Sequence, residues 1–93
     1  MNRELIRSSA FIRAARRHLK KNPQQANHLE TTLILLSENA FAPQLKTHKL
    51  KGDLDGVWAC SVGHDLRILF ELVPHDGVEA ILLLTIGTHD EVY

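Results

Sequence analysis

Residues 47–72 read THKLKGDLDGVWACSVGHDLRILFEL, and this stretch decides the fold. Leu66, Ile68 and Phe70 fall on one side of an extended chain and Arg67 on the other, which is the two-residue period of a β-strand. Glycines bound the turn that precedes residue 57, and Gly63 opens the next turn. We therefore predict strands at residues 45–51, 57–62 and 66–73, joined by turns at residues 52–56 and 63–65.

The flanking sequence extends this pattern in both directions. Residues 78–86 are apolar on both faces, as expected of a central strand, and the turn PHDG at residues 74–77 precedes them. Upstream, the pattern predicts a short strand at residues 3–7, a helix from Ser8 or Ser9 to Lys21, and a second helix from Pro23 to Glu38. Two helices followed by hairpin-linked strands predict an α+β fold with the helices packed on a small, mostly antiparallel, twisted sheet.

The two predicted helices each have an apolar stripe. In the first helix it comprises Phe11, Ala15, His18 and Leu19, and in the second Ala26, Leu29, Leu33 and Leu36. The first helix also has a basic arc opposite its apolar stripe, made of Arg13, Arg16, Arg17 and Lys20. This helix is therefore expected to bury one side and offer a basic one to a partner.

Length and composition favour one domain, residues 1–93, with an ordinary core. The chain has 93 residues, of which 44% are hydrophobic and 24% charged. It has neither the long uncharged apolar run of a membrane span nor the apolar segment of a signal peptide, so we expect a cytoplasmic protein without a membrane partner. Its only cysteine, Cys60, excludes an internal disulfide and is expected in the core.

The zero net charge conceals two oppositely charged halves. Residues 1–51 contain ten basic and three acidic residues, a net charge of +7, and residues 52–93 contain one basic and eight acidic residues, a net charge of −7. If the basic residues gather on one face they can attract a polyanion, whereas interleaving of the halves would cancel them. The sequence leaves both arrangements open.

Three histidines at predicted strand ends are candidates for chemistry: His48, His64 and His89. Each taken alone is compatible with an ordinary surface position. Together they could also bind zinc, although none of the compact spacings typical of zinc ligands is present, and we predict neither a metal nor another cofactor. Trp58 is expected to pack in the core.

Residues 47–72, followed by ILLLTIGTHDEVY at residues 81–93, resemble the RelE/YafQ superfamily of bacterial type II toxins, nearest to the YafQ-like branch. The resemblance covers nearly the whole chain. It implies a ribosome-dependent endoribonuclease that cleaves mRNA in the ribosomal A site. It also implies a cognate antitoxin that binds the toxin and blocks it.

The resemblance assigns roles to individual residues. His48 matches a catalytic histidine, and His89 matches the histidine of the Gly-Thr-His motif. Asp65 matches an aspartate before the following strand, Arg67 the strand arginine, and Tyr93 an aromatic position after that motif. The resemblance and the charge pattern together indicate RNA-binding residues, namely Lys46, Lys49, Lys51, Arg13, Arg16, Arg17 and Lys20.

Three features depart from the pattern of the superfamily. Ser61 occupies the place of one YafQ histidine, for which His64 is a substitute three residues on. Thr85 stands where an arginine precedes the Gly-Thr-His motif, and the chain is neutral where these toxins are often basic. Two further functions therefore stay open: a ParE-like toxin that binds DNA gyrase, and an inactive relic that binds only its antitoxin.

The chemistry of RNA cleavage fits the same residues. A 2′-hydroxyl attacks the adjacent phosphorus if a base removes its proton, a cation stabilises the phosphoryl oxygens and an acid protonates the departing 5′-oxygen. Histidine suits both proton transfers. We predict that His48 and His89 divide them, in an order the sequence leaves open, and that Arg67, Lys49 and Lys51 stabilise the phosphate. Asp65 is interpreted as orienting a histidine or shaping its turn. Tyr93 is interpreted as stacking on a base or as a C-terminal anchor in the core or on its rim.

Overall fold

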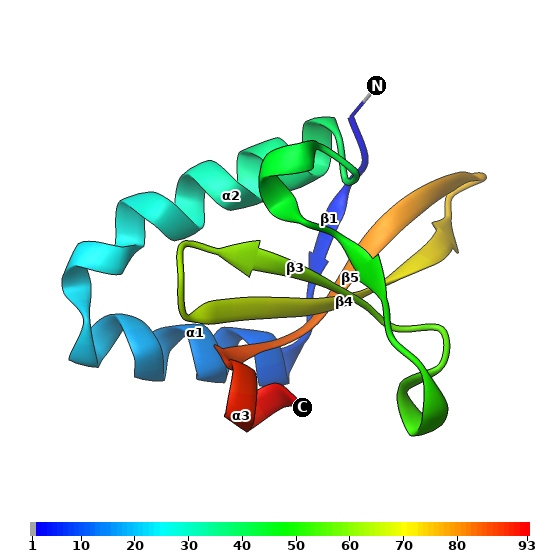
Figure 1. Ribbon diagram of the computed structural model, residues 1–93. Coiled ribbons are helices and arrows are strands. Elements are labelled where there is room, and N and C mark those ends of the chain that lie inside the picture. Colours follow the sequence, from blue (N-terminus) through cyan, green and yellow to red (C-terminus); the bar gives the residue numbers. More distant parts are fainter. Residues whose placement is uncertain (1) are drawn as a thin grey trace.

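A five-stranded sheet with two long helices on one face forms the body of the protein (Figure 1). The computed structural model describes residues 2–93, except for the side chain of Asp53. The helices are α1 (Ser9–Lys21), α2 (Ala26–Glu38) and α3 (His89–Val92), and the strands are β1 (Leu5–Arg7), β2 (His48–Lys49), β3 (Trp58–Val62), β4 (Leu66–His75) and β5 (Val78–Thr88). The predicted α+β class is confirmed.

The sheet has the order β1-β5-β4-β3-β2. Only β1 runs parallel to its neighbour, β5, and the other three pairings are antiparallel. In the register, Arg67 of β4 lies between Ser61 of β3 and Gly87 of β5. The central strands therefore bring segments far apart in sequence to the same part of the sheet.

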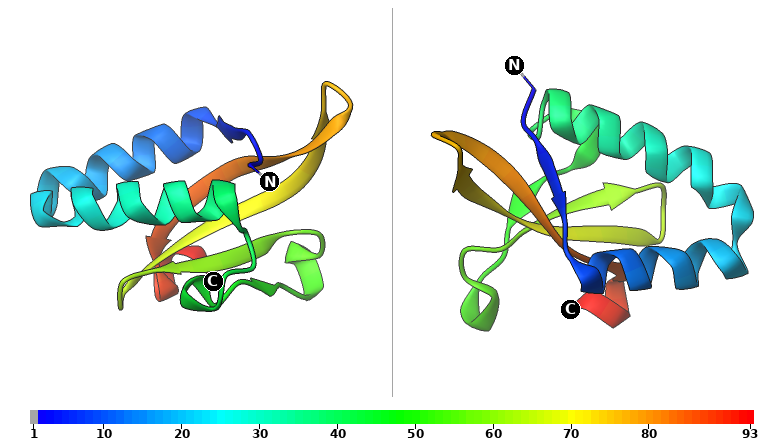
Figure 2. Two further views of the ribbon diagram at one scale, coloured as in Figure 1. Left: turned by 90° about the horizontal axis from the view of Figure 1, so that it is seen from above. Right: turned by 180° about the vertical axis from the view of Figure 1, so that it is seen from behind.

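The main core fills the space between the sheet and α1 and α2. Phe70, Ile68 and Leu83 from the strands and Leu36 from α2 are fully buried there. Figure 2 shows both long helices on one face of the sheet and α3 on the other. The segment between α2 and β3 contributes to both faces, since Leu45 is buried in the main core and Leu54 packs in a separate small cluster. The alternation along β4 explains the two faces, because Leu66, Ile68 and Phe70 point to the main core and Leu69 points away from it.

Local sequence accounts for the helix ends. Ser8 caps α1, since its side chain accepts a hydrogen bond from the Phe11 backbone N–H at 3.0 Å. Pro23 begins a separate 3₁₀ turn, Pro23–Gln25, so α2 starts at Ala26 rather than at Pro23 as predicted. Ala26 is exposed instead of lying on the buried stripe of α2. Among the residues described, no helix has both the length and the apolar character that a membrane crossing requires.

The strand boundaries differ from the prediction at both ends of the sheet. Of the predicted strand at residues 45–51, only His48–Lys49 pairs, because Leu45 is buried in a 3₁₀ turn and Lys46 adopts a left-handed conformation with φ 51°. The turn predicted at residues 74–77 contracts to Asp76 and Gly77, and Pro74 continues β4. Proline is tolerated there because β3 pairs with β4 only as far as Phe70.

Candidate active site

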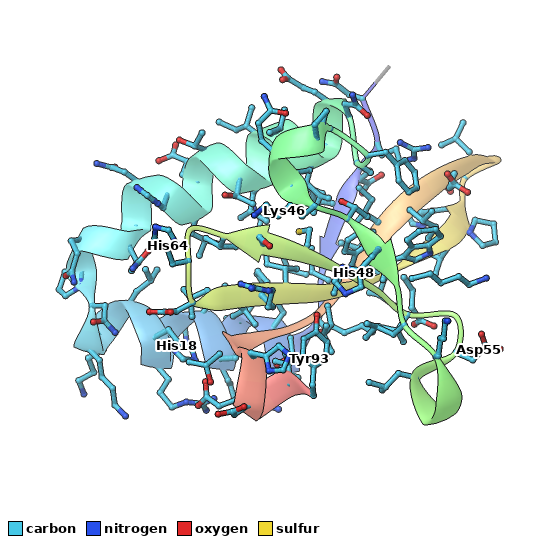
Figure 3. All side chains as sticks on the ribbon, in the orientation of Figure 1. His18, Lys46, His48, Asp55, His64 and Tyr93 are labelled. Atoms are coloured by element: carbon cyan, nitrogen blue, oxygen red, sulfur yellow. The ribbon has the colours of Figure 1, made fainter. Side chains whose placement is uncertain are left out.

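Three aromatic side chains from distant parts of the sequence meet on the face of the sheet opposite α1 and α2. The Tyr93 hydroxyl lies 3.4 Å from Nε2 of His48, and the Tyr93 ring packs edge-on against His89 with a centroid separation of 4.5 Å. Figure 3 shows His48 and Tyr93 near one another in front of the sheet. We call His48, His89 and Tyr93 the aromatic triad.

The backbone fixes which nitrogen of His48 carries its proton when the ring is neutral. Nδ1 of His48 lies 3.1 Å from the carbonyl oxygen of Lys46. Because a carbonyl oxygen only accepts, Nδ1 is the donor, and Nε2 of the neutral ring keeps its lone pair. The atom of His48 that can take up a proton is therefore the one that faces Tyr93.

Helix α3 holds two members of the triad at its two ends. Its N-terminus is closed by a capping box, in which the Thr88 N–H donates to Oε1 of Glu91 at 2.8 Å and the Glu91 N–H donates to Oγ1 of Thr88 at 3.3 Å. The Tyr93 N–H donates to the carbonyl of His89 at 3.0 Å. These bonds turn the chain back so that the Tyr93 and His89 rings touch.

The environment of Tyr93 keeps its phenol protonated at neutral pH. Partial burial raises the pKa of Tyr93, and the nearby positive charge of Arg67 offsets part of that effect. The side chain is 43% exposed, so Tyr93 lies on the surface of the site rather than in the core. Its exposure excludes a place inside the core for Tyr93, whereas an anchor on the rim of the core and stacking on a base both stay predictions.

Arg67 on β4 supplies a positive charge near Tyr93. Its Nη1 donates to the carbonyls of His64 at 3.2 Å and Leu66 at 3.0 Å. These bonds use Nη1 and leave the N–H groups of Nε and Nη2 for another acceptor. Ser61, which pairs with Arg67 across the strands, is half-buried.

A second, small apolar cluster lies on the same face of the sheet as the aromatic triad. It is built around Val57, Ala59 and Leu69, and its partly buried members include Leu54 and Val92. Leu54 comes from the loop after β2 and Val92 from α3. The cluster therefore ties both segments that bear the aromatic triad to the same face of the sheet.

The other predicted site residues are spread more widely. His64 and Asp65 are exposed in the turn between β3 and β4, and Figure 3 places His64 at the far end of that hairpin from His48 and Tyr93. Among the side chains described, no group of three or more histidines, cysteines and acids lies close enough to hold a metal ion. The three-histidine zinc site is thus not assembled. The predicted RNA-binding residues are all exposed, with Lys46, Lys49 and Lys51 near His48 in sequence and Arg13, Arg16, Arg17 and Lys20 on α1.

The structure adds three residues that the sequence reasoning missed: His18, Gly87 and Glu91. Nε2 of His18 on α1 lies 3.1 Å from Oε1 of Glu91. A Cβ on Gly87 would lie 3.0 Å from Cγ1 of Val92 and 3.1 Å from Cβ of Glu91, so only glycine lets α3 approach this closely. The signal for α3 was present as Thr88-x-x-Glu91, the sequence of a capping box.

The chain matches the model of a known protein family. A model of the family described as "Bacterial toxin of type II toxin-antitoxin system, YafQ" matches residues 3–93. A search of curated proteins gave no match.

Solved structures of bacterial toxins share the fold. YafQ from Escherichia coli BL21(DE3) superposes with a TM-score of 0.78 at 19% identity, over 98% of each chain. The E. coli DinJ–YafQ toxin–antitoxin complex contains a chain with a TM-score of 0.77 at 20% identity, covering 100% of this chain and 99% of that one. A metal-bound toxin from Helicobacter pylori gives 0.78 at 23% identity over the whole of both chains.

Proposed function

Because this chain belongs to the YafQ family of bacterial type II toxin–antitoxin toxins, we propose that it is an endoribonuclease that cuts mRNA on the translating ribosome. The observation that carries this proposal is the aromatic triad. Two histidines meet at one tyrosine on an exposed face, and the Nε2 lone pair of His48 faces outward from its backbone anchor. A site that only binds a protein has no need of such a pair.

In the proposed reaction His48 is the general base. Its Nδ1–H is held by the Lys46 carbonyl, so Nε2 removes the proton from the 2′-hydroxyl as the 2′-oxygen attacks the adjacent phosphorus. The Tyr93 hydroxyl marks the place of the substrate hydroxyl, because it already lies 3.4 Å from this nitrogen. When RNA binds, the 2′-hydroxyl takes over that contact.

His89 is then the general acid that protonates the departing 5′-oxygen. Its Nδ1 lies 3.5 Å from a carboxylate oxygen of Asp90, which orients the protonated ring. Arg67 and the exposed lysines Lys49 and Lys51 stabilise the negative charge of the phosphate. The reaction leaves a 2′,3′-cyclic phosphate and a 5′-hydroxyl, and it uses no metal or cofactor.

Asp65 and His64 have a lesser role in this scheme. Both are exposed in the β3–β4 turn, and Figure 3 shows His64 far from His48 and Tyr93. The His64 carbonyl accepts a hydrogen bond from Arg67, so the turn orients the arginine through its backbone. We propose that the side chains of His64 and Asp65 contact RNA rather than transfer protons.

We also propose that a cognate antitoxin binds this toxin, in the cytoplasm where translation takes place. The E. coli relative with the same fold was crystallised as a toxin–antitoxin complex. The exposed basic residues of α1 offer a complementary surface to an acidic amphipathic segment.

The test is primer extension on a reporter mRNA after the protein is induced, with the start codon of the reporter intact or removed. Cuts that appear only on the translated message are expected, and His48→Ala and His89→Ala should each reduce them by about 10²-fold or more. His28→Ala, on the exposed surface of α2, is the matched control. Circular dichroism establishes that each variant is folded.

Other outcomes would contradict the proposal. Growth arrest with intact message and induction of the DNA-damage response would indicate a ParE-like inhibitor of gyrase. Folded protein that neither arrests growth nor cuts RNA, yet binds its antitoxin, would indicate an inactive relic. Full cleavage by the double variant of His48 and His89 would refute the assigned mechanism.

A further inference from the structure

The Glu91 carboxylate joins three parts of the molecule that are separate in sequence. Its Oε1 accepts the Thr88 N–H at 2.8 Å at the end of β5, and the same oxygen lies 3.1 Å from Nε2 of His18 on α1. The Cβ and Oε1 atoms of Glu91 also sit above Cα of Gly87, within 3.2 Å of the position a Cβ there would take. One side chain thus links α3, β5 and α1.

The His18 end of this contact is shielded from water, whereas the Glu91 side chain is 47% exposed. The His18 side chain is only 12% exposed, and its Nε2 has no aligned hydrogen-bond partner among the residues described. A polar nitrogen enclosed in this way is unfavourable unless an opposite charge compensates it. The Glu91 carboxylate is the acceptor within reach, so the two side chains stabilise each other.

Charges on α1 and hydrogen bonds of α3 act on Glu91 in the same sense. The Thr88 backbone N–H lowers the pKa of Glu91 most, and burial opposes it as the second-largest effect. The Thr88 hydroxyl and then His18 and Arg17 on α1 lower the pKa further. The carboxylate is therefore ionised at neutral pH and attracts α1 toward α3.

Helix α3 needs such contacts because it has four residues. A single helical turn is not stable by itself, so contacts with the rest of the fold decide where it lies. These contacts are the Glu91 carboxylate with His18, the close approach to Gly87 and the packing of Val92 on the small apolar cluster. The positions of His89 and Tyr93 follow directly from that of α3.

We propose that Glu91 and His18 are positioning residues, which hold α3 so that Tyr93 and His89 meet His48. The role in catalysis rests on the proposed ribonuclease function, but the effect on geometry does not. Removing either side chain should let α3 move by an ångström or more while the sheet stays folded. A displacement of this size lowers the rate of a positioned reaction by about 10- to 100-fold.

The first measurement is cleavage by Glu91→Ala, Glu91→Gln and His18→Ala on programmed ribosomes. The alanine variants should cut about tenfold or more slowly at saturating ribosomes, with a half-saturating concentration within about twofold of the original protein. Glu91→Gln keeps a side-chain oxygen that accepts from the Thr88 N–H and lies beside Nε2 of His18, so it should recover most of the rate. Glu30→Ala and His28→Ala, both exposed on α2, are the matched controls.

The second measurement is independent of RNA. In the free protein, nuclear Overhauser cross-peaks should connect the Tyr93 ring with the rings of His48 and His89, because these rings lie within 6.4 and 4.5 Å between centroids. The cross-peaks to His48 should weaken in Glu91→Ala and His18→Ala and persist in Glu91→Gln. If Glu91→Ala does not fold, His18→Ala carries the comparison.

These two readouts separate the proposals. Lost cross-peaks with slow cleavage support the positioning role. Lost cross-peaks in a protein whose original form cuts no RNA refute the ribonuclease function but uphold the positioning. The positioning role is overturned if the cross-peaks survive in folded His18→Ala and Glu91→Ala. It is also overturned if both variants cleave at the full rate.

Discussion

At the scale of single residues, one backbone conformation prepares the chemistry of the site. Lys46 adopts the left-handed region at φ 51°, just before β2, and its carbonyl is then turned toward Nδ1 of His48. A non-glycine residue rarely adopts this region, so the conformation is held by its surroundings. The side chain of Lys46 thus matters less to the triad than its carbonyl does.

Two substitutions of Tyr93 can separate the contribution of its ring to cleavage from that of its hydroxyl. Its hydroxyl contact with His48 is long, at 3.4 Å, whereas its ring packs on His89 at 4.5 Å and can stack on a base. We expect Tyr93→Phe to keep cleavage within about threefold and Tyr93→Ala to lose about 10- to 100-fold, the usual worth of one stacked base. Single-turnover cleavage measures both. Equal losses in the two variants would instead assign the effect to the hydroxyl.

The buried thiol of Cys60 should make the stability of the protein fall at alkaline pH. Burial raises the pKa of the Cys60 thiol from 9.0 to about 12, so the unfolded chain ionises first. The stability due to this thiol is complete below pH 9.0 and is lost as the pH rises toward about 12, by at most about 1.4 kcal/mol per pH unit. Urea unfolding at increasing pH should show this loss. Cys60→Ala should be less stable below pH 9.0 but should have a flatter dependence above it, and an unchanged slope would contradict the assignment.

At the scale of elements, two glycines with opposite roles can be compared. Gly77 has φ +81° with open space around it, so Gly77→Ala strains the β4–β5 turn and lowers stability by about 1 kcal/mol or more without touching the site. A Cβ on Gly87 meets Val92 at 3.0 Å and Glu91 at 3.1 Å, so Gly87→Ala pushes α3 away. We expect a loss of cleavage of about tenfold or more in Gly87→Ala alone. Thermal unfolding and cleavage per folded molecule measure the two effects, and a fully active Gly87→Ala would show that α3 tolerates the shift.

The helices and strands differ in how well the sequence predicts them. Strand β4 and both long helices follow from the periodicity of their apolar residues, and the start of α1 follows also from its Ser8 cap. The strand predicted at residues 45–51 is mostly wrong, because the burial of Leu45 and the turn at Lys46 depend on contacts with other parts of the chain. Helix α3 escaped notice because a four-residue helix has no period to read, although its capping box was visible.

The sequence also predicted only part of the candidate site. His48, His89 and Tyr93 were identified by their motifs, and the structure brings them together. His64 was placed with them because it too follows a strand, but the β3–β4 turn lies at the opposite end of its hairpin. His18 was read as part of an apolar stripe, and only the packing of α1 beside α3 reveals its partner.

At the scale of the whole molecule, the two oppositely charged halves are partly interleaved. Arg3 pairs with Glu79 at 3.0 Å and His18 with Glu91 at 3.1 Å, and each pair joins the basic half to the acidic one. The exposed arc of α1 remains basic beyond these contacts, with Arg13, Arg16 and Lys20. A neutral protein can therefore still present a cationic surface to RNA.

This surface predicts how binding responds to salt. Each cationic contact with a phosphate adds about 0.7 to 0.9 to the slope of log affinity against log salt concentration. We expect Arg13→Gln combined with Arg16→Gln to weaken ribosome binding and to lower that slope by about 1.5, with the cleavage rate at saturation unchanged. Binding measured by sedimentation at several salt concentrations tests this, and Glu30→Gln combined with Glu38→Gln on α2 is the control. If the slope stays the same, α1 does not face RNA, and the lysines beside His48 must carry the electrostatic attraction alone.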